Sequence, residues 1–205
     1  MRPAAIHIQA VLFNNADLLQ KLPPQYHKWL LLFDPKKSEK LPDNKGCHHH
    51  IELKAAEDQL RMGPIYRLIL EEEQLLKEYL DNLIREGKIR PSSSTTRSAI
   101  LFIPKPNGKG LRLCVNYRSL NQNTVKDTIP LPTIQELQDW LNGVDTITKI
   151  DLKAGFHLIR MLLPNVKYTA FRTKFRLFKY TVMPFGLTNA PVTFQREINR
   201  ILRPV

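Results

Sequence analysis

The residue of this chain best placed for chemistry is Asp151, in the block TKIDLKAGFHLIRM. The β-branched run DTITKID predicts a strand that ends at Asp151, and Gly155 favours a turn directly after it. A carboxylate in that position suits Mg²⁺, which binds through one or two carboxylates together with phosphate oxygens and keeps some waters. In phosphoryl-type transfer, two such ions clamp the attacking and leaving oxygens. Taken alone, a strand-end aspartate is more often a turn-forming or helix-capping residue, so its neighbours decide between the two interpretations.

A second block, VMPFGLTNAPVTFQ, begins at Val182 and is rich in residues that restrict the backbone. Pro184 and Pro191 fix their φ angles, and Gly186 permits a close approach of another group to the main chain. The pattern predicts a rigid platform that presents Phe185, whose ring would stack on a base or a template sugar. The alternative is an aromatic side chain that is simply packed against its neighbours.

A predicted hairpin carries two basic residues of interest. The runs SAILFIP and LRLCVNY are strand-like, and KPNGKG between them has the Pro, Asn and Gly of a hairpin loop. Lys105 and Arg112 come from opposite sides of this hairpin and are expected to converge on a triphosphate, Arg112 through its planar fork and Lys105 as a point charge. The alternative is a solvated basic hairpin. No Walker loop occurs in the sequence.

Amphipathic helices are predicted beside these blocks. In LEEEQLLKEYLDNLIREGKI, apolar residues recur every four positions, which predicts a helix from Glu71 that ends before Gly87. PLPTIQELQDWLNG contains a capping box, with Thr133 at the N-cap and Glu136 three positions later. The predicted buried face of that helix consists of Ile134, Leu137 and Leu141.

The last forty residues predict strands followed by a helix. YTAFRTKFRLFKYTVM alternates aromatic residues with Lys and Arg, which indicates a pair of strands within residues 168–183. NAPVTFQREINRILRPV places Pro191 in a first helical turn and Phe194, Ile198 and Leu202 on one face. The fold class predicted for the chain is α+β, with mostly antiparallel strands and flanking helices.

The formal net charge of the chain is +12, and it is concentrated in one half. Residues 1–100 hold 15 Lys and Arg against 13 Asp and Glu, a net of +2, whereas residues 101–205 hold 16 against 6, a net of +10. A basic half of this size favours a polyanionic partner, most often nucleic acid, because phosphate neutralisation releases counterions. The alternative is a basic surface without such a partner.

The first sixty residues show no sustained hydrophobic period and are expected to form an extended arm, with one short helix at residues 26–33. Cys47 is followed by three histidines, which suggests zinc. Ligands adjacent in sequence point in divergent directions, however, and no second cluster of ligands occurs, so an exposed loop is favoured there.

Cys47 and Cys114 are the only cysteines, so the sequence indicates no disulfide framework and favours a reducing compartment. The first residues lack the cationic segment and long apolar core of a secretory signal. The longest apolar run, WLLLF, is far shorter than a membrane span. The sequence therefore predicts a soluble intracellular protein without a membrane partner, and it gives no indication of oligomeric state.

Six blocks between residues 62 and 205 resemble, in order, the reverse transcriptase of gypsy-type long-terminal-repeat retrotransposons. They are LDNLIREGKIRPSSS, LRLCVNYRSLN, IPLPTIQELQ, KIDLKAGFHLIRM, KYTAFRT and VMPFGLTNAPVTFQ. LPDNKGCHHHIEL is similar to the family's connector between protease and polymerase. The resemblance implies an arm or connector at residues 1–60, then the fingers and a partial palm of a right-hand polymerase at residues 61–205. Its partners would be RNA and DNA template-primer and deoxynucleoside triphosphates.

The resemblance also implies roles for single residues. Asp151 matches the first of three aspartates that hold two Mg²⁺ ions in the family. Ala154 and Gly155 match positions whose backbone amides face the triphosphate, and Phe156 matches the steric gate that excludes a ribose 2′-hydroxyl. Lys105 and Arg112 match the residues of the fingers that grip the triphosphate, and Phe185 and Gly186 match the platform beside nucleotide and template.

The chain also departs from the family pattern. Leu158 stands where Gln is usual, Asn116 where Asp is usual, and Lys179 where an acidic residue is common. The aromatic-x-Asp-Asp hairpin that supplies the other two metal ligands is absent from the sequence. A single carboxylate should hold two divalent ions weakly. We therefore expect a fragment of an RNA-directed DNA polymerase that is inactive by itself; the alternative is a non-catalytic nucleic-acid-binding relic of a retroelement.

Overall fold

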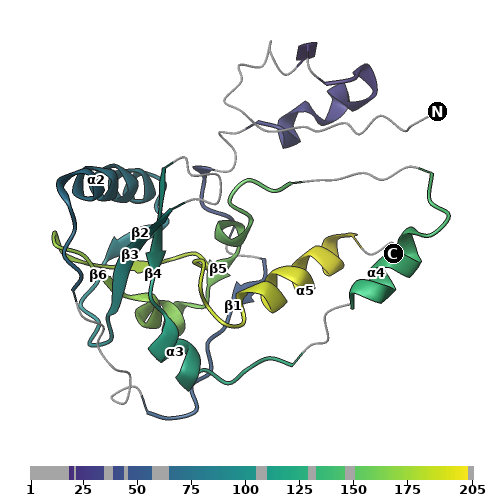
Figure 1. Cartoon of the computed structure of the whole chain (residues 1–205). Coiled ribbons are helices and arrows are strands. Elements are labelled where there is room, and N and C mark those ends of the chain that lie inside the picture. Colours follow the sequence, from purple (N-terminus) through teal and green to yellow (C-terminus); the bar gives the residue numbers. More distant parts are fainter. Residues whose placement is uncertain are drawn as a thin grey trace. The chain divides into compact units, whose positions relative to one another are not determined.

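The structure of the chain is a computed structural model. The chain divides into two compact units, one made of Met1–Glu39 and Thr128–Ala154, the other of Lys40–Asp127 and Gly155–Val205. Most of the secondary structure belongs to the second unit (Figure 1). The residues that the structure describes are 19–20, 22–34, 39–43, 46–56, 65–104, 110–128, 133–145 and 151–202.

Two short helices described in the first unit lie at predicted places. The 3₁₀ helix η1 (Pro24–Leu32) confirms a helix near residues 26–33, in the tighter 3₁₀ geometry. Helix α4 (Ile134–Leu141) begins with the predicted capping box. Thr133 Oγ1 accepts a hydrogen bond from the Glu136 N–H at 3.2 Å, and the Glu136 carboxylate accepts one from the Thr133 N–H at 2.6 Å.

The predicted buried face of α4 is wrong. Ile134, Leu137 and Leu141 are 75%, 42% and 51% exposed. The capping box fixes the start of the helix through hydrogen bonds within four residues, whereas burial of an apolar stripe requires a partner that no local pattern specifies. Residues 146–150 of the strand predicted at 145–151 lie outside the described residues.

A five-stranded sheet forms the centre of the second unit, in the order β2-β7-β6-β3-β4. The predicted hairpin is confirmed, since β3 (Ser98–Pro104) and β4 (Leu111–Val115) pair antiparallel, with Ile103 opposite Arg112. The predicted pair of strands within residues 168–183 is also confirmed and pairs antiparallel, while β6 joins β3 in parallel. The α+β class with a mostly antiparallel sheet is thus confirmed. The remaining strands are β2 (Ile89–Pro91), β6 (Phe171–Arg172) and β7 (Leu177–Tyr180).

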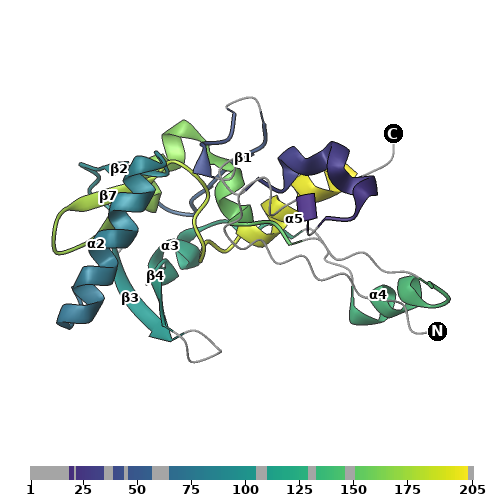
Figure 2. The same cartoon turned by 90° about the horizontal axis from the view of Figure 1, so that it is seen from above.

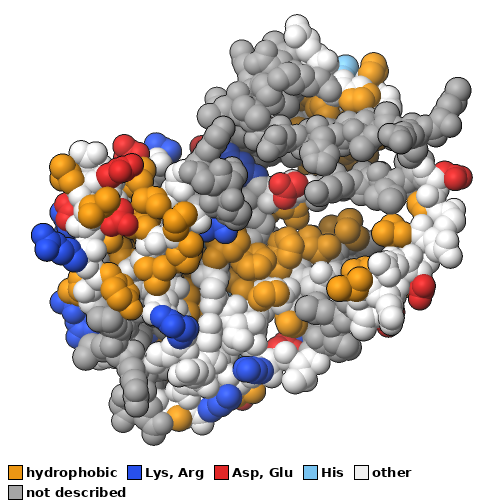
Figure 3. All heavy atoms as spheres, viewed as in Figure 1, with side chains coloured by type: hydrophobic (Ala, Val, Ile, Leu, Met, Phe, Trp, Pro, Cys, Tyr) orange, Lys and Arg blue, Asp and Glu red, His pale blue; other side chains and the backbone are white. Residues whose placement is uncertain are grey.

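Helix α2 (Leu70–Arg85) lies along this sheet in both views (Figure 1, Figure 2). Its predicted stripe is confirmed, because Leu76, Leu80 and Leu83 are buried against the sheet. Glu72 caps the first turn by accepting a hydrogen bond from the Ile69 N–H at 3.0 Å. In the space-filling view, Lys and Arg side chains lie at the edge of the molecule beyond β6 (Figure 3).

A second hydrophobic cluster in this unit gathers residues from distant parts of the chain. Buried Tyr117, Ile159 and Met183 belong to it, and so does Ile51, from the predicted arm. The elements around it are α3 (Arg118–Asn123), η4 (Gly155–Leu158), η5 (Leu163–Thr169) and α5 (Ala190–Leu202). Helix α5 confirms the predicted C-terminal helix, with Pro191 in its first turn. No described helix is long and apolar enough to cross a bilayer.

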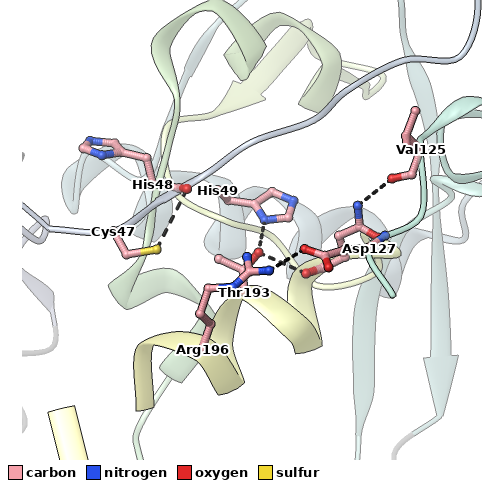
Figure 4. Close-up of polar contacts among 8 residues, drawn as sticks. Cys47, His48, His49, Val125, Asp127, Thr193 and Arg196 are labelled. Atoms are coloured by element: carbon pink, nitrogen blue, oxygen red, sulfur yellow. Dashed lines mark hydrogen bonds and ion pairs between the residues drawn. The ribbon is translucent and has the colours of Figure 1, made fainter. Parts of the chain in front are cut away.

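The exposed loop predicted at Cys47 and the following histidines is wrong. Residues His48–His49 form strand β1, which pairs in parallel with β5 (Arg160–Met161), and His49 is only 1% exposed. Figure 4 shows His49 directed at Thr193 of α5, with a hydrogen bond of 2.8 Å between Nδ1 and Oγ1. Because the strand that pairs with β1 lies more than one hundred residues away in the sequence, no local sequence pattern predicts β1. A domain boundary near residue 60 stays a prediction.

The hydrogen-bond network around His49 fixes its tautomer. Thr193 Oγ1 donates its only hydrogen to the Asn189 carbonyl at 3.1 Å, so it accepts from His49 Nδ1–H. Burial, with a smaller contribution from the charge of neighbouring His50, lowers the pKa of His49 to about 4. The imidazole is therefore neutral in the folded chain at pH 7.

Asn165 of η5 contacts the main chain of Ile51 and so provides a test of the packing between these two segments of the second unit. Its side chain accepts from the Ile51 N–H and donates to the Ile51 carbonyl, both at 3.1 Å. We expect Asn165→Ala to lower the free energy of unfolding by about 2 kcal/mol, because two buried backbone groups lose their partners. Urea denaturation followed by circular dichroism measures this.

The matched control is Asn199→Ala, since Asn199 is exposed on α5 and only accepts a hydrogen bond from exposed Gln195. Its effect should stay within about 0.5 kcal/mol. Equal effects of the two substitutions would contradict a structural role of residues near Ile51.

Candidate nucleotide-binding site

The predicted platform is a turn that holds one aromatic ring outward. Met183 and Pro184 are buried, whereas Phe185 is 59% exposed. Gly186 has φ +94°, a region that side chains with a Cβ rarely adopt. A Cβ at Gly186 would lie 3.5 Å from the Tyr117 ring and from the Val115 carbonyl, which is ordinary contact. Glycine is therefore required by the backbone angle, and not by the close approach that the sequence suggested.

Asn121 of helix α3 holds this turn in place. Its side-chain amide donates to the Gly186 carbonyl at 2.7 Å, and its side-chain oxygen accepts from the Thr188 N–H at 2.9 Å. The neighbouring Leu120 is buried and anchors α3 to the unit. Asn121 thus acts as a positioning residue for Phe185. No sequence pattern predicted this role for Asn121, although it lies in the block LRLCVNYRSLN.

Phe156 and Phe185, two of the predicted site residues, lie together. Their rings are stacked, with centroids 4.9 Å apart and an angle of 26° between the planes. Phe194 of α5 packs next to Phe156, with ring centroids 5.3 Å apart and an angle of 55° between the planes. The aromatic cluster connects η4, the platform turn and α5, so a movement of Phe156 requires the other two rings to adjust.

His157 packs next to this aromatic cluster, and no sequence pattern predicted a role for it. It is buried, and its ring lies 5.8 Å from the Phe185 ring and 5.9 Å from the Tyr180 ring. Burial, assisted by the Lys88 ammonium and opposed by the Glu86 carboxylate, lowers the pKa of His157 to about 4. Lys88 and Glu86 form an ion pair of 2.6 Å. The His157 ring that lies next to Phe185 is therefore a neutral imidazole, and not a cation, at pH 7.

Of the two predicted triphosphate-binding residues, only Arg112 lies in the part of the chain that the structure describes. Arg112 lies on β4 with its side chain exposed, three residues before Val115, whose carbonyl faces Gly186. Lys105 lies outside the described residues. Whether the two side chains converge stays a prediction.

Asp151 and Ala154 belong to the first unit, and the remaining described site residues belong to the second. Asp151 is exposed. Ala154 has φ +52°, the one described non-glycine residue with a positive φ. This left-handed conformation costs about 1–2 kcal/mol for a residue with a Cβ. Gly155 follows it and begins η4, which carries Phe156.

The described residues do not fit a two-magnesium site. No group of three or more His, Cys, Asp or Glu side chains that could hold a metal ion occurs among them. Two divalent ions repel each other and need several anionic ligands, and Asp151 alone supplies one.

The family of the chain follows from its match to a protein-family model. The family model for reverse transcriptase (RNA-dependent DNA polymerase) matches residues 103–205, half of the chain. The chain belongs to this reverse transcriptase family. The match covers Arg112, Asp151, Phe156 and Phe185.

Polyproteins of retrotransposons are similar to this reverse transcriptase chain. The Pol polyprotein of transposon 297 from Drosophila melanogaster is 39% identical over 144 residues, which are 68% of this chain and 14% of that polyprotein. The transposon Tf2-3 polyprotein of Schizosaccharomyces pombe is 34% identical over 185 residues, 89% of this chain and 14% of that polyprotein. The chain thus spans about one seventh of these relatives, and the second match includes much of the region predicted as an arm.

Solved structures of foamy virus protease–reverse transcriptase share the fold. The native prototype foamy virus protein superposes with a TM-score of 0.66 at 20% identity, over 95% of this chain and 28% of the viral one. The complex of the foamy viral enzyme with an RNA/DNA hybrid superposes with a TM-score of 0.63 at 19% identity, over 92% and 26%. At these identities the similarity shows the fold alone.

His157 predicts a defined pH dependence of stability. Its pKa is about 4 in the folded chain and near 6.5 in the unfolded chain, so the unfolded chain binds the proton first as pH falls. The stabilisation is complete above about pH 6.5 and is lost as pH falls toward 4, by up to about 3 kcal/mol. We expect His157→Phe, which keeps an aromatic ring, to flatten the fall in the free energy of unfolding across this window.

The measurement is urea denaturation at a series of pH values. His49 titrates in the same window, so only the difference between variant and unmodified chain reports on His157. Lys77→Gln, an exposed substitution on α2, is the control, because it removes no histidine, and it should leave the slope unchanged. The same slope in all three proteins would show that His157 is not the buried group described above.

Proposed function

We propose that residues 61–205 supply the fingers and part of the palm of a retrotransposon RNA-directed DNA polymerase, preceded by a connector. Membership of the reverse transcriptase family supports the reaction class. The observation that carries the assignment of the site is the stacking of Phe156 on Phe185, held by Asn121. This cluster brings a candidate gate and a candidate platform into contact on one side of the unit.

Each candidate residue has a role in this proposal. Phe185 and Gly186 form the surface against which nucleotide and template lie, and Phe156 excludes a ribose 2′-hydroxyl. Arg112, together with Lys105, neutralises the triphosphate. The left-handed turn at Ala154 supports a role for the backbone amides of Ala154 and Gly155 in facing the phosphates, since strained backbone tends to occur at functional sites.

The proposed ligands follow from the family and from charge. Foamy viral relatives of similar fold have been solved with double-stranded DNA and with an RNA/DNA hybrid. We extend this to an RNA or DNA template-primer for the present chain, together with deoxynucleoside triphosphates. The net charge of +10 in residues 101–205 supports a polyanionic partner.

Asp151 is the candidate Mg²⁺ ligand, and by itself it should bind the ion weakly. We therefore expect the purified chain 1–205 to show no primer extension above background with Mg²⁺ and all four deoxynucleoside triphosphates. Gel analysis of a labelled primer on an RNA template measures this. Extension that Asp151→Ala abolishes would refute the proposed inactivity and would assign catalysis to this chain.

Arg112 distinguishes the polymerase fragment from a nucleic-acid-binding relic. We expect Arg112→Ala to weaken binding of a deoxynucleoside triphosphate about tenfold, the loss of one charge-assisted contact, and to weaken hybrid binding by less. Fluorescence titrations with a labelled triphosphate and a labelled hybrid measure both.

Arg85→Ala is the matched control, because Arg85 is exposed in the last turn of α2. It should leave triphosphate binding unchanged. An equal loss for triphosphate and hybrid in Arg112→Ala would favour the relic, a module that contacts phosphate backbones without a nucleotide site.

A further inference from the structure

The loop between β2 and β3 carries a row of hydroxyl side chains. Residues 92–96 are all Ser or Thr, and of these only Ser93 and Thr95 are exposed. Thr96 is 8% exposed, and its hydroxyl donates to the Lys167 carbonyl at 3.2 Å. The fold therefore leaves two hydroxyl groups of this loop accessible to a large partner.

A turn within the loop leaves the Ser93 hydroxyl unused. Ser92 Oγ donates to Ser94 Oγ at 3.0 Å and accepts from the Ser94 N–H at 3.1 Å, so these two half-buried serines hold each other. The Ser92 N–H donates to the Leu177 carbonyl of β7 at 3.0 Å, which anchors the start of the loop. Ser93 lies between the two serines, and its hydroxyl takes part in no hydrogen bond with another described residue.

Arg90 stands three residues before Ser93, on the outermost described strand of the five-stranded sheet. Its side chain is exposed, and it lies directly opposite Lys179 of β7. No ion pair joins either of these cations to a carboxylate in the described part of the chain. Like charges directly opposite each other destabilise a sheet, so an anion placed near Arg90 would offset an unfavourable contact.

The spacing of Arg90 and Ser93 occurs once in the sequence. No other Ser or Thr of the chain has an arginine three positions before it. Protein kinases select their substrates largely by such patterns of charge. A carboxylate of the kinase recognises the planar guanidinium through two parallel hydrogen bonds, a geometry that lysine does not match. Of the two exposed hydroxyl groups, only that of Ser93 therefore has the arginine that such a kinase requires.

We propose that Ser93 is a phosphorylation site for an arginine-directed protein kinase that recognises Arg90, and that the phosphate then pairs with the Arg90 guanidinium. The site does not depend on the proposed polymerase function, since it needs only this loop and Arg90.

In the transfer, Ser93 Oγ forms a bond to the γ-phosphorus of ATP, and the bond from that phosphorus to the β–γ bridging oxygen breaks. ADP leaves with the electron pair, and the serine proton passes to the catalytic aspartate of the kinase. The added phosphate carries a charge of about −1.5 to −2 at pH 7. Three residues of extended chain span at most about 11 Å, so the phosphate stays within reach of the long Arg90 side chain.

The test treats the full, folded chain with ATP and a calmodulin-dependent protein kinase, which selects an arginine three residues before its target. Trypsin releases residues 89–97 as one peptide, because Pro91 blocks cleavage after Arg90. Fragmentation mass spectrometry locates the phosphate within this peptide, and we expect one phosphate, on Ser93. A peptide without phosphate, or with the phosphate on Thr95, would overturn the site.

Variants identify the residue that the kinase recognises. Ser93→Ala should remove the phosphate from this peptide, whereas Thr95→Ala should keep it. Arg90→Gln should lower kcat/KM for phosphorylation about tenfold or more, because one two-pronged contact is lost. Arg97→Gln is the matched control, since it removes an arginine from the other end of the same loop, and it should leave kcat/KM unchanged. An equal loss in both arginine variants would contradict recognition of Arg90.

The melting temperature tests the pairing of the phosphate with Arg90. We expect phosphorylation to raise it by about 2–4 °C at low ionic strength, the size of one charge-assisted contact in a chain of this length. The rise should shrink in high salt, which screens exposed charges. Chain treated with the kinase without ATP is the control. An unchanged or lower melting temperature after phosphorylation would overturn the pairing.

Discussion

Asparagine side chains hold the second unit together at the places where its polypeptide segments meet. An amide side chain presents one acceptor and one donor and so satisfies a neighbouring main chain as a strand would. Asn121 does this for the platform turn, Asn165 for Ile51, and Asn123 for Ala55, whose N–H and carbonyl it contacts at 3.0 and 3.4 Å. Asn189 accepts from the Asp127 N–H and donates to the Val125 carbonyl. The segments joined are short and irregular, and these amides supply hydrogen-bond partners to their backbone groups, which are buried at Ile51 and partly or fully exposed at the other contacts.

This constraint explains which features the sequence could predict. Helix α2, the β3–β4 hairpin and the capping box of α4 follow from signals within a few residues, and the structure confirms all three. The amide contacts join residues 62 to 114 positions apart, and β1 pairs with a strand as distant. Such pairings leave no periodicity in the local sequence, so His49 was expected in a loop and Asn121 received no role. Helix α4 is the opposite case. Its apolar residues follow a clear helical pattern in the sequence, but they stay exposed in the structure.

Several residues predicted for the nucleotide site, or packed next to one, adopt states that cost folding free energy. Ala154 in the first unit and Gly186 in the second unit each have a positive φ angle, and His157 in the second unit is buried next to Phe185 in its neutral form. Each is stable only because the surrounding packing determines it, which is the condition that strained functional sites share. The family block VMPFGLTNAPVTFQ identified the platform in advance, because Gly and Pro report backbone restriction directly. It did not identify the supports, which act through side chains placed elsewhere in the chain.

The proposed binding of nucleic acid and a metal-dependent catalytic step place opposite electrostatic demands on this chain. A net charge of +10 in residues 101–205 attracts polyanions and, by the same field, opposes the binding of divalent cations. A nucleotidyl-transfer site overcomes that opposition by grouping carboxylates, and the described residues contain no such group. Contacts to phosphate need only the cations and aromatic rings that the second unit already presents. The nucleic-acid-binding part of the family's function therefore depends on fewer residues than its chemistry, and a chain that keeps the first need not keep the second.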